Sequence, residues 1–137
     1  VTKEKKDSNL KLDLEGFTKI RNEFRKNPMI GYLNINSLRN KIVYLSQICL
    51  NSPIDILCID ETKLDASYPD SQFYIEGYQY PPYRKDRDKY GGGKIVYIKE
   101  GFIVKRLINF ECDDIETICL EHTISKINWC IPPKNSN

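Results

Sequence analysis

The first regular pattern along the chain is an apolar run, a helical stripe and a second apolar run. Residues 29–35 (MIGYLNI) and 54–60 (IDILCID) have the length and composition of buried strands. Between them, apolar side chains recur at helical spacing, at Leu38, Ile42, Leu45 and Ile48. Asn36 or Ser37 would cap this helix, and Asn51-Ser52-Pro53 would end it. The pattern therefore predicts two parallel strands joined by a crossover helix.

Polar side chains stand where each of these predicted strands ends. Asn34 and Asn36 end the first run, and Asp60 and Glu61 end the second. Parallel strands deliver their carboxyl ends to the same edge of a sheet, and ligands of open α/β sheets bind at that edge. We therefore expect these amide and carboxylate side chains to meet around one site.

The segments on either side of this unit have different patterns. Residues 1–28 are rich in charge, and the span from Phe17 to Arg25 predicts a short amphipathic helix, so this segment is a linker or a helical approach. Residues 65–92 form a long polar stretch of turn residues, and such stretches are often functional. Strand-like segments then follow at 94–99, 103–110, 115–124 and 126–131.

Composition narrows the class of protein. The chain has 137 residues, which suits one domain, and is 40% hydrophobic and 29% charged. A net charge of +2 neither demands nor opposes a nucleic-acid partner. No apolar window is long enough for a membrane span, so no membrane partner is expected. With no signal-peptide core and no initiator Met, we expect an internal piece of a longer reading frame, located in the nucleus or cytoplasm.

The five cysteines form no CxxC pair, and their odd number argues against a closed disulfide framework. Cys58 and Cys119 lie inside apolar runs, where a thiol behaves as a small hydrophobe. The expectation is reduced core cysteines and no structural zinc.

Four stretches, in order and at consistent spacing, carry a family resemblance: LNINSLRNK, DILCIDETKLD, PDSQFYIEGY and RKDRDKYGGGKIVYIKE. From about Ile30 to Asn137 the chain resembles the front part of an endonuclease/exonuclease/phosphatase domain. The likeness is greatest to the endonucleases of non-LTR (LINE-type) retrotransposons, relatives of AP endonucleases. The implied fold is α+β: a partial DNase-I-like two-layer β-sandwich flanked by helices, with the C-terminal portion missing. The domain would occupy residues 29–137, after the charged segment 1–28.

The resemblance also implies a function and a set of site residues. The chain would be the N-terminal fragment of a DNA endonuclease that cleaves phosphodiesters with Mg²⁺ or Mn²⁺. Asn34 and Glu61 match catalytic positions, and Glu61 and Asn36 match positions at the metal. The residue types suit this chemistry, because Mg²⁺ takes oxygen ligands and a neutral amide binds phosphate without repelling it. The residues by themselves also allow ordinary roles: a strand-end hydrogen bond for Asn34, a solvated charge for Glu61 and a helix cap for Asn36.

Basic and aromatic side chains are interleaved near the same edge. The candidate nucleic-acid contacts are Lys63, Arg84, Arg87 and Tyr90. The alternative is a polar loop whose tyrosines pack on the scaffold. DNA is the implied partner, and a reverse transcriptase domain in the same polyprotein would be a further one.

The chain also departs from the family pattern. Leu33 replaces a common Trp, Asp60 adds a charge beside Glu61, and a tyrosine expected before Pro132 is absent. The later Asp, Asn and His of the family have no counterpart, and His122 falls in a middle strand. Phosphodiester hydrolysis by this chain alone should therefore be very weak or absent. Two alternatives stay open: a non-catalytic nucleic-acid-binding or interaction remnant, and a phosphatase or phosphodiesterase acting on lipid head groups.

Overall fold

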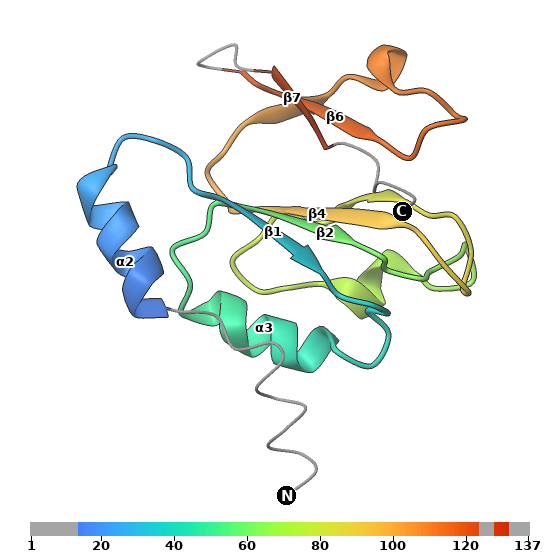
Figure 1. Cartoon of the computed structure of the whole chain (residues 1–137), viewed down its shortest axis with the longest axis horizontal. Coiled ribbons are helices and arrows are strands. Elements are labelled where there is room, and N and C mark those ends of the chain that lie inside the picture. Colours follow the sequence, from blue (N-terminus) through green and yellow to red (C-terminus); the bar gives the residue numbers. More distant parts are fainter. Residues whose placement is uncertain (1–13, 124–127, 132–137) are drawn as a thin grey trace, which may run out of the picture.

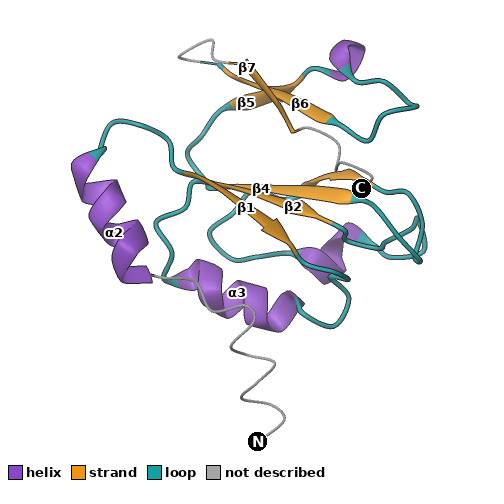
Figure 2. Ribbon diagram, viewed as in Figure 1, coloured by secondary structure: helices purple, strands orange, loops and turns teal. Residues whose placement is uncertain are grey.

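The computed structural model describes residues 14–123 and 128–131 as an α+β fold with two helices and two sheets (Figures 1 and 2). Helix α2 spans Leu14–Glu23 and α3 spans Ile42–Leu50. The strands are β1 (Ile30–Asn34), β2 (Ile56–Asp60), β3 (Tyr83–Lys85), β4 (Lys94–Ile98), β5 (Val104–Arg106), β6 (Ile118–His122) and β7 (Asn128–Ile131). Residues 1–13, 124–127 and 132–137 lie outside the described part, and so do the predictions that fall on them.

The predicted strand–helix–strand unit is present. Strands β1 and β2 pair in parallel, from Ile30 opposite Ile56 to Asn34 opposite Asp60, and α3 lies between them in sequence. Strand β4 joins β2 antiparallel and β3 joins β4, which gives the strand order β1-β2-β4-β3. The parallel pair therefore occupies one side of the sheet, with β1 as its edge.

The second sheet has the order β5-β6-β7, all antiparallel. Figure 1 shows three layers, with the helices on one side of the four-stranded sheet and the three-stranded sheet on the other. The expectation that all cysteines are reduced is wrong for one pair. Cys119 on β6 lies directly opposite Cys130 on β7, and the two form a disulfide. The register that sets them face to face is not visible in the sequence.

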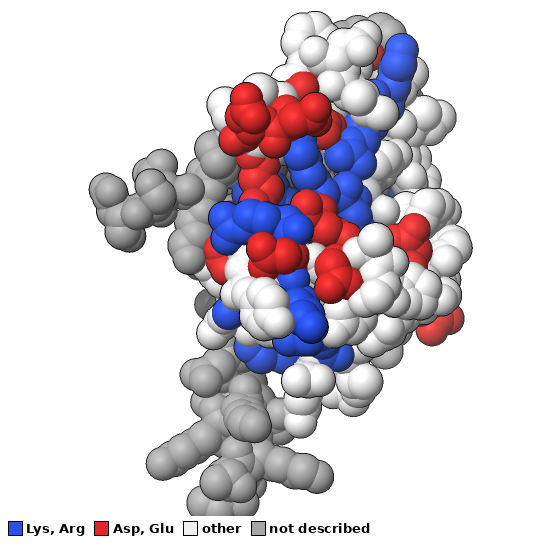
Figure 3. All heavy atoms as spheres, turned by 90° about the vertical axis from the view of Figure 1, so that its right-hand side faces the viewer, with Lys and Arg blue, Asp and Glu red and all other residues white. Residues whose placement is uncertain are grey.

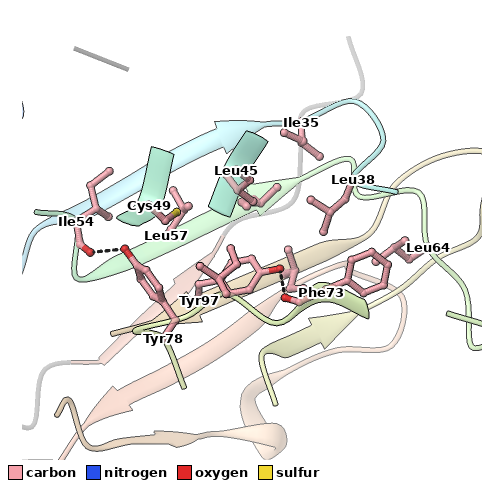
Figure 4. Packing of buried hydrophobic residues seen from close by; sticks show 13 residues of the cluster. Ile35, Leu38, Leu45, Cys49, Ile54, Leu57, Leu64, Phe73, Tyr78 and Tyr97 are labelled. Atoms are coloured by element: carbon pink, nitrogen blue, oxygen red, sulfur yellow. Dashed lines mark hydrogen bonds between the residues drawn. The ribbon is translucent and has the colours of Figure 1, made fainter. Parts of the chain in front are cut away.

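Two buried clusters cover the two faces of the four-stranded sheet. Toward the helices, Leu45 and Cys49 of α3 lie with Leu57 of β2 in one buried cluster (Figure 4), to which Ile59 also belongs. The Tyr78 hydroxyl donates to the Ile54 carbonyl and the Tyr97 hydroxyl to the Phe73 carbonyl. Between the sheets, alternate side chains of β2 and β4 meet β6: Ile56, Cys58, Val96, Ile98, Ile118 and Leu120. Because both faces are covered, all residues of β2 and β4 are buried, and they are apolar except for Asp60 and Lys94.

Burial confirms the prediction for Cys58. Desolvation raises the pKa of its thiol to about 12, and that of Cys49 to about 11, so both stay protonated and act as hydrophobic side chains. Cys112 is the exposed free cysteine of the described residues.

The predicted helix cap is wrong. Helix α3 begins at Ile42, with Lys41 at its N-cap, and Asn36 and Ser37 lie in a preceding loop with positive φ angles of 47° and 82°. That loop instead runs beside the chain that follows β2. Segment 103–110 is also divided, into strand β5 and a short 3₁₀ helix at Ile108–Phe110.

The long polar segment serves the scaffold as well as the surface. A 3₁₀ helix at Asp70–Phe73 buries Phe73, and Ile75 and Tyr78 are buried after it. The alternative that tyrosines pack on the scaffold therefore holds for Tyr78. No helix in the described ranges has the length and apolarity needed to cross a membrane.

Candidate functional site

The loops that follow β1 and β2 lie side by side at one edge of the sheet. The Ser37 N–H donates to the Glu61 carbonyl at 2.8 Å, and the Leu38 N–H donates to the Thr62 carbonyl at 3.0 Å. Pairing thus continues past the strand ends, and the arrowheads of β1 and β2 point to the same end of the molecule in Figure 1. The structure brings the segment of Asn34 and the segment of Glu61 together, as the parallel strands predict.

Backbone strain is concentrated in these two loops. Within the described residues, the non-glycine residues with left-handed backbone are Asn36, Ser37, Glu61 and Lys63. Each such conformation costs about 1–3 kcal/mol and persists where the surrounding structure enforces it, most often at functional sites. Here the enforcement comes from the hydrogen bonds between the loops and from Lys41, whose ammonium donates to the carbonyls of Ile35 and Asn36.

The two amides are both engaged in this arrangement. The Asn34 side-chain oxygen accepts the Asn36 N–H at 3.2 Å, which is the strand-end hydrogen bond considered as its ordinary role. The Asn36 side-chain oxygen accepts from the Lys63 ammonium at 2.6 Å. Asn36 would have to exchange this ammonium for a cation in order to ligate a metal, and Lys63 would have to leave it to contact a phosphate.

Glu61 is held by the glycine turn, which we define as residues 91–93. Its Oε2 accepts the Gly92 N–H at 3.3 Å, while the Lys63 N–H donates to the Gly92 carbonyl at 2.9 Å. Gly93 has a φ of 92°, and a Cβ there would lie 2.2 Å from the Thr62 hydroxyl oxygen. Glycine is therefore required for the turn to lie against the chain that carries Glu61.

A pocket of about 430 Å³ opens at this end of the molecule, and Glu61 lines it. Lys85, Arg87 and Gly92 line it from the side of the four-stranded sheet, and Asp113, Asp114 and Glu116 line it from the loop that leads into β6. The Glu116 carboxylate accepts the Gly93 N–H. Two carboxylates, one from the loop after β2 and one from the loop before β6, thus accept hydrogen bonds from successive amides of the glycine turn.

Asp60 does not add an unbalanced charge beside Glu61. Its carboxylate pairs with the Lys94 ammonium and accepts from the Tyr32 hydroxyl. Asp60 is 2% exposed and Lys94 is 1% exposed. Burial and the contact with Asp60 together raise the pKa of Tyr32, so its phenol stays protonated. The charge that Asp60 brings beside Glu61 is therefore offset by a lysine on the neighbouring strand.

Arg84 is committed to the scaffold. Its guanidinium pairs with Asp86 at 2.7 Å and Asp70 at 2.9 Å, donates to the Tyr68 carbonyl at 2.8 Å, and lies over the Phe73 ring. Burial alone would lower the pKa of Arg84, but the two carboxylates outweigh it and raise the pKa. A nucleic acid would have to displace these partners to reach Arg84.

Arg87 and Tyr90 are exposed instead. The Arg87 side chain is 59% exposed and lies 3.9 Å from Glu116, and Tyr90 is 80% exposed with the Lys89 ammonium above its ring. Figure 3 faces this end of the molecule and shows basic and acidic side chains interleaved rather than a continuous basic strip. The surface therefore offers phosphates only separate points of attraction.

The donor chemistry suits a hard cation. No group of three or more His, Cys, Asp or Glu side chains in residues 14–123 and 128–131 is arranged to hold a metal. Mg²⁺, however, is often bound through one or two carboxylates, with water and substrate oxygens as its other ligands. Glu61, which lines the pocket, can supply one such carboxylate, and the Asn36 side-chain oxygen is a second oxygen donor once Lys63 leaves it.

Sequence reasoning missed Lys94, Glu116 and the role of the glycine turn. A lysine at the start of the apolar run KIVYIK was a visible signal for a buried partner, since an unpaired lysine is rarely buried. Glu116 carried no such signal, because only the packing of the second sheet brings it to Gly93.

Comparison with known proteins adds a likeness of fold. No protein-family model matches the sequence, and none of the curated proteins searched matches it. Among solved structures, the chain is similar to the 3′ phosphatase NExo from Neisseria, determined with a product DNA hairpin, with a TM-score of 0.53 and 17% sequence identity. The match covers 74% of this chain and 39% of that protein. At this identity the likeness shows the fold, and this chain spans well under half of the neighbour's length.

Proposed function

We propose that this chain is the front part of a Mg²⁺- or Mn²⁺-dependent DNA endonuclease of the retrotransposon type, with very weak or no activity alone. The observation that carries the proposal is the position of Glu61, in a pocket where the two sheets meet, beside the end of the strand that bears Asn34. The fold match to a DNA-processing phosphatase supports it, because that protein was determined with a DNA product.

The residues have distinct parts in this proposal. Glu61 would hold the cation, with Asn36 as the second candidate ligand, and Asn34 would bind a phosphate oxygen through its neutral amide. When bound, the cation supplies stabilisation of the charge that develops on phosphate oxygens. Arg87, Tyr90 and Lys63 would contact the DNA backbone, as would Arg84 if it left its carboxylates. In the complete protein, a partial sandwich of the DNase I type would be continued, and a reverse transcriptase domain would be the partner in the same polyprotein.

The test combines metal binding with cleavage. We expect the chain to bind Mn²⁺, measured by electron paramagnetic resonance, and Glu61→Gln to weaken this binding. Glu76→Gln is the matched control, since Glu76 is exposed on the loop before Gly77. A supercoiled plasmid with Mg²⁺ or Mn²⁺ then measures nicking, which should be slow at best and absent in Glu61→Gln. Mn²⁺ binding that Glu61→Gln leaves unchanged would overturn the metal assignment.

The alternative is a non-catalytic nucleic-acid-binding remnant. The exposure of Arg87 and Tyr90 at this end favours binding, and the Lys63 ammonium on the Asn36 side-chain oxygen disfavours metal ligation there. Salt-sensitive DNA binding without cleavage, equal in the presence of Mg²⁺ and of EDTA, would support this function instead. Release of phosphate from a lipid head group would instead support a phosphatase or phosphodiesterase that acts on lipid head groups.

A further inference from the structure

Glu61 and Glu116 both accept hydrogen bonds from the glycine turn. The Gly92 N–H donates to Glu61 and the Gly93 N–H donates to Glu116. The turn cannot shift toward Thr62, because Gly93 already lies against that side chain. Whatever fixes the turn therefore also fixes the donor that orients the Glu61 carboxylate.

Glu116 reaches the turn from the other sheet. It lies in the loop before β6, whereas the turn leads into β4. Its side chain is 23% exposed, and its Oε2 lies 3.9 Å from the Nε of Arg87. Arg87 in turn donates to the Gly91 carbonyl at 3.2 Å, and its guanidinium would collide with any Cβ at Gly92. The Arg87 side chain thus contacts both the glycine turn and Glu116.

We propose that Glu116 is a positioning residue of this site, an inference that rests on the proposed function. Its carboxylate fixes the glycine turn, and with it the orientation of Glu61. Its charge also holds Arg87 against the turn, so that a polyanion must compete with Glu116 for this arginine. One side chain of the loop before β6 thereby acts on both Glu61 and Arg87.

Two substitutions separate these effects. Glu116→Gln keeps an oxygen that accepts the Gly93 N–H but removes the charge beside Arg87. Glu116→Ala removes both. Asp114→Asn is the matched control, because Asp114 lines the same pocket and its replacement removes an equal charge. Circular dichroism and thermal unfolding establish that each variant is folded.

The first measurement needs neither metal nor DNA. Amide hydrogen exchange by NMR should be about fivefold faster at Gly93 in Glu116→Ala, which is the loss of one hydrogen bond, with Gly92 following. Glu116→Gln should change it little, and Asp114→Asn not at all. The Arg87 Nε–H signal should shift in both Glu116 variants. Unchanged exchange at Gly93 and an unchanged Arg87 signal in Glu116→Ala would overturn the inference.

The second measurement uses a short DNA duplex and fluorescence anisotropy. Glu116→Gln should bind it about two- to fivefold more tightly than the unsubstituted chain, the range expected for releasing an exposed ion pair. This gain in DNA affinity should exceed the gain in Asp114→Asn. It should vanish when Glu116→Gln is combined with Arg87→Ala. An equal gain in Asp114→Asn, or a gain that persists without Arg87, would contradict the role of the charge. If the unsubstituted chain binds neither Mn²⁺ nor DNA, the proposed function fails, while the exchange and Arg87 signals still decide the role of Glu116.

Discussion

The two faces of the four-stranded sheet are filled in different ways. The face toward the helices is packed mainly by apolar side chains, and its buried Tyr78 and Tyr97 each donate to a backbone carbonyl. At its margin, directly before β2, the buried Asp55 carboxylate pairs with Arg21 of α2. The face toward the second sheet begins apolar at Ile56 and Ile98 and ends ionic, at Asp60 and Lys94. The ionic row lies at the end that carries Glu61. Stability and a candidate site are therefore divided between two faces of the same strands.

The difference has a physical reason. Apolar packing needs only shape, whereas a buried charge needs a partner at one defined position. Asp60 lies between Asn34 on β1 and Lys94 on β4 in the strand register, so its partner is fixed by the sheet itself. The fold tolerates a buried carboxylate at this end only because the register places Lys94 opposite Asp60.

The largest effect should come from separating the buried pair. Lys94→Met leaves the Asp60 carboxylate without its cation, which should lower the free energy of unfolding by about 3–5 kcal/mol. Asp60→Asn combined with Lys94→Met should recover most of that loss, because no charge then remains buried. Urea unfolding measures both variants. A single variant as stable as the unsubstituted chain would show that the ionic row does not constrain the fold.

A somewhat smaller effect is expected on the helix face. Leu57 is 2% exposed and packs in the cluster beneath α3, so Leu57→Ala should cost about 3 kcal/mol of unfolding free energy. Val43, which lies on α3 and is 65% exposed, provides the control, and Val43→Ala should change the free energy of unfolding by no more than about 0.5 kcal/mol. Chemical denaturation of the two variants compares them. Equal losses would mean that α3 is not packed on the sheet as described.

The smallest effect should appear as a dependence on pH in the second sheet. Burial alone would raise the pKa of Glu111, but hydrogen bonds from Arg106 and the Cys119 N–H outweigh it and lower the pKa from its usual 4.5. A carboxyl with a lowered folded-state pKa adds stability above pH 4.5 and loses it as the pH falls through the folded-state value. Thermal unfolding between pH 7 and pH 3 should therefore show a shallower decline in Glu111→Gln. Parallel curves would exclude this linkage.

The spacing of apolar residues along the sequence predicted much of the fold. The apolar runs at 29–35 and 54–60 and the stripe between them predicted the parallel pair and α3, and with them the meeting of the Asn34 and Glu61 segments. These features are local or follow from one rule of chain topology. The start of α3 was misplaced because the loop at Asn36 pairs with the next loop, a contact that no local preference encodes.

The contacts of the candidate site depend on strand register and burial, which cannot be deduced from the sequence pattern. Arg84 and Arg87 are three residues apart and were equivalent as candidate DNA contacts, yet one is 12% exposed between two carboxylates and the other is 59% exposed. The Asp60–Lys94 pair joins residues 34 positions apart, and Cys119 meets Cys130 only through strand pairing. Such contacts are set by how the sheets assemble.

Strand β1 is an edge of its sheet, and Ile30 and Tyr32 on it are 52% and 59% exposed. An edge of this kind presents backbone donors and acceptors in a row, beside apolar side chains, to any extended chain in solution. Protein concentration therefore has to be controlled in experiments on this chain. If two such edges pair, oligomeric size will depend on concentration, so light scattering across a dilution series should precede every binding or cleavage measurement.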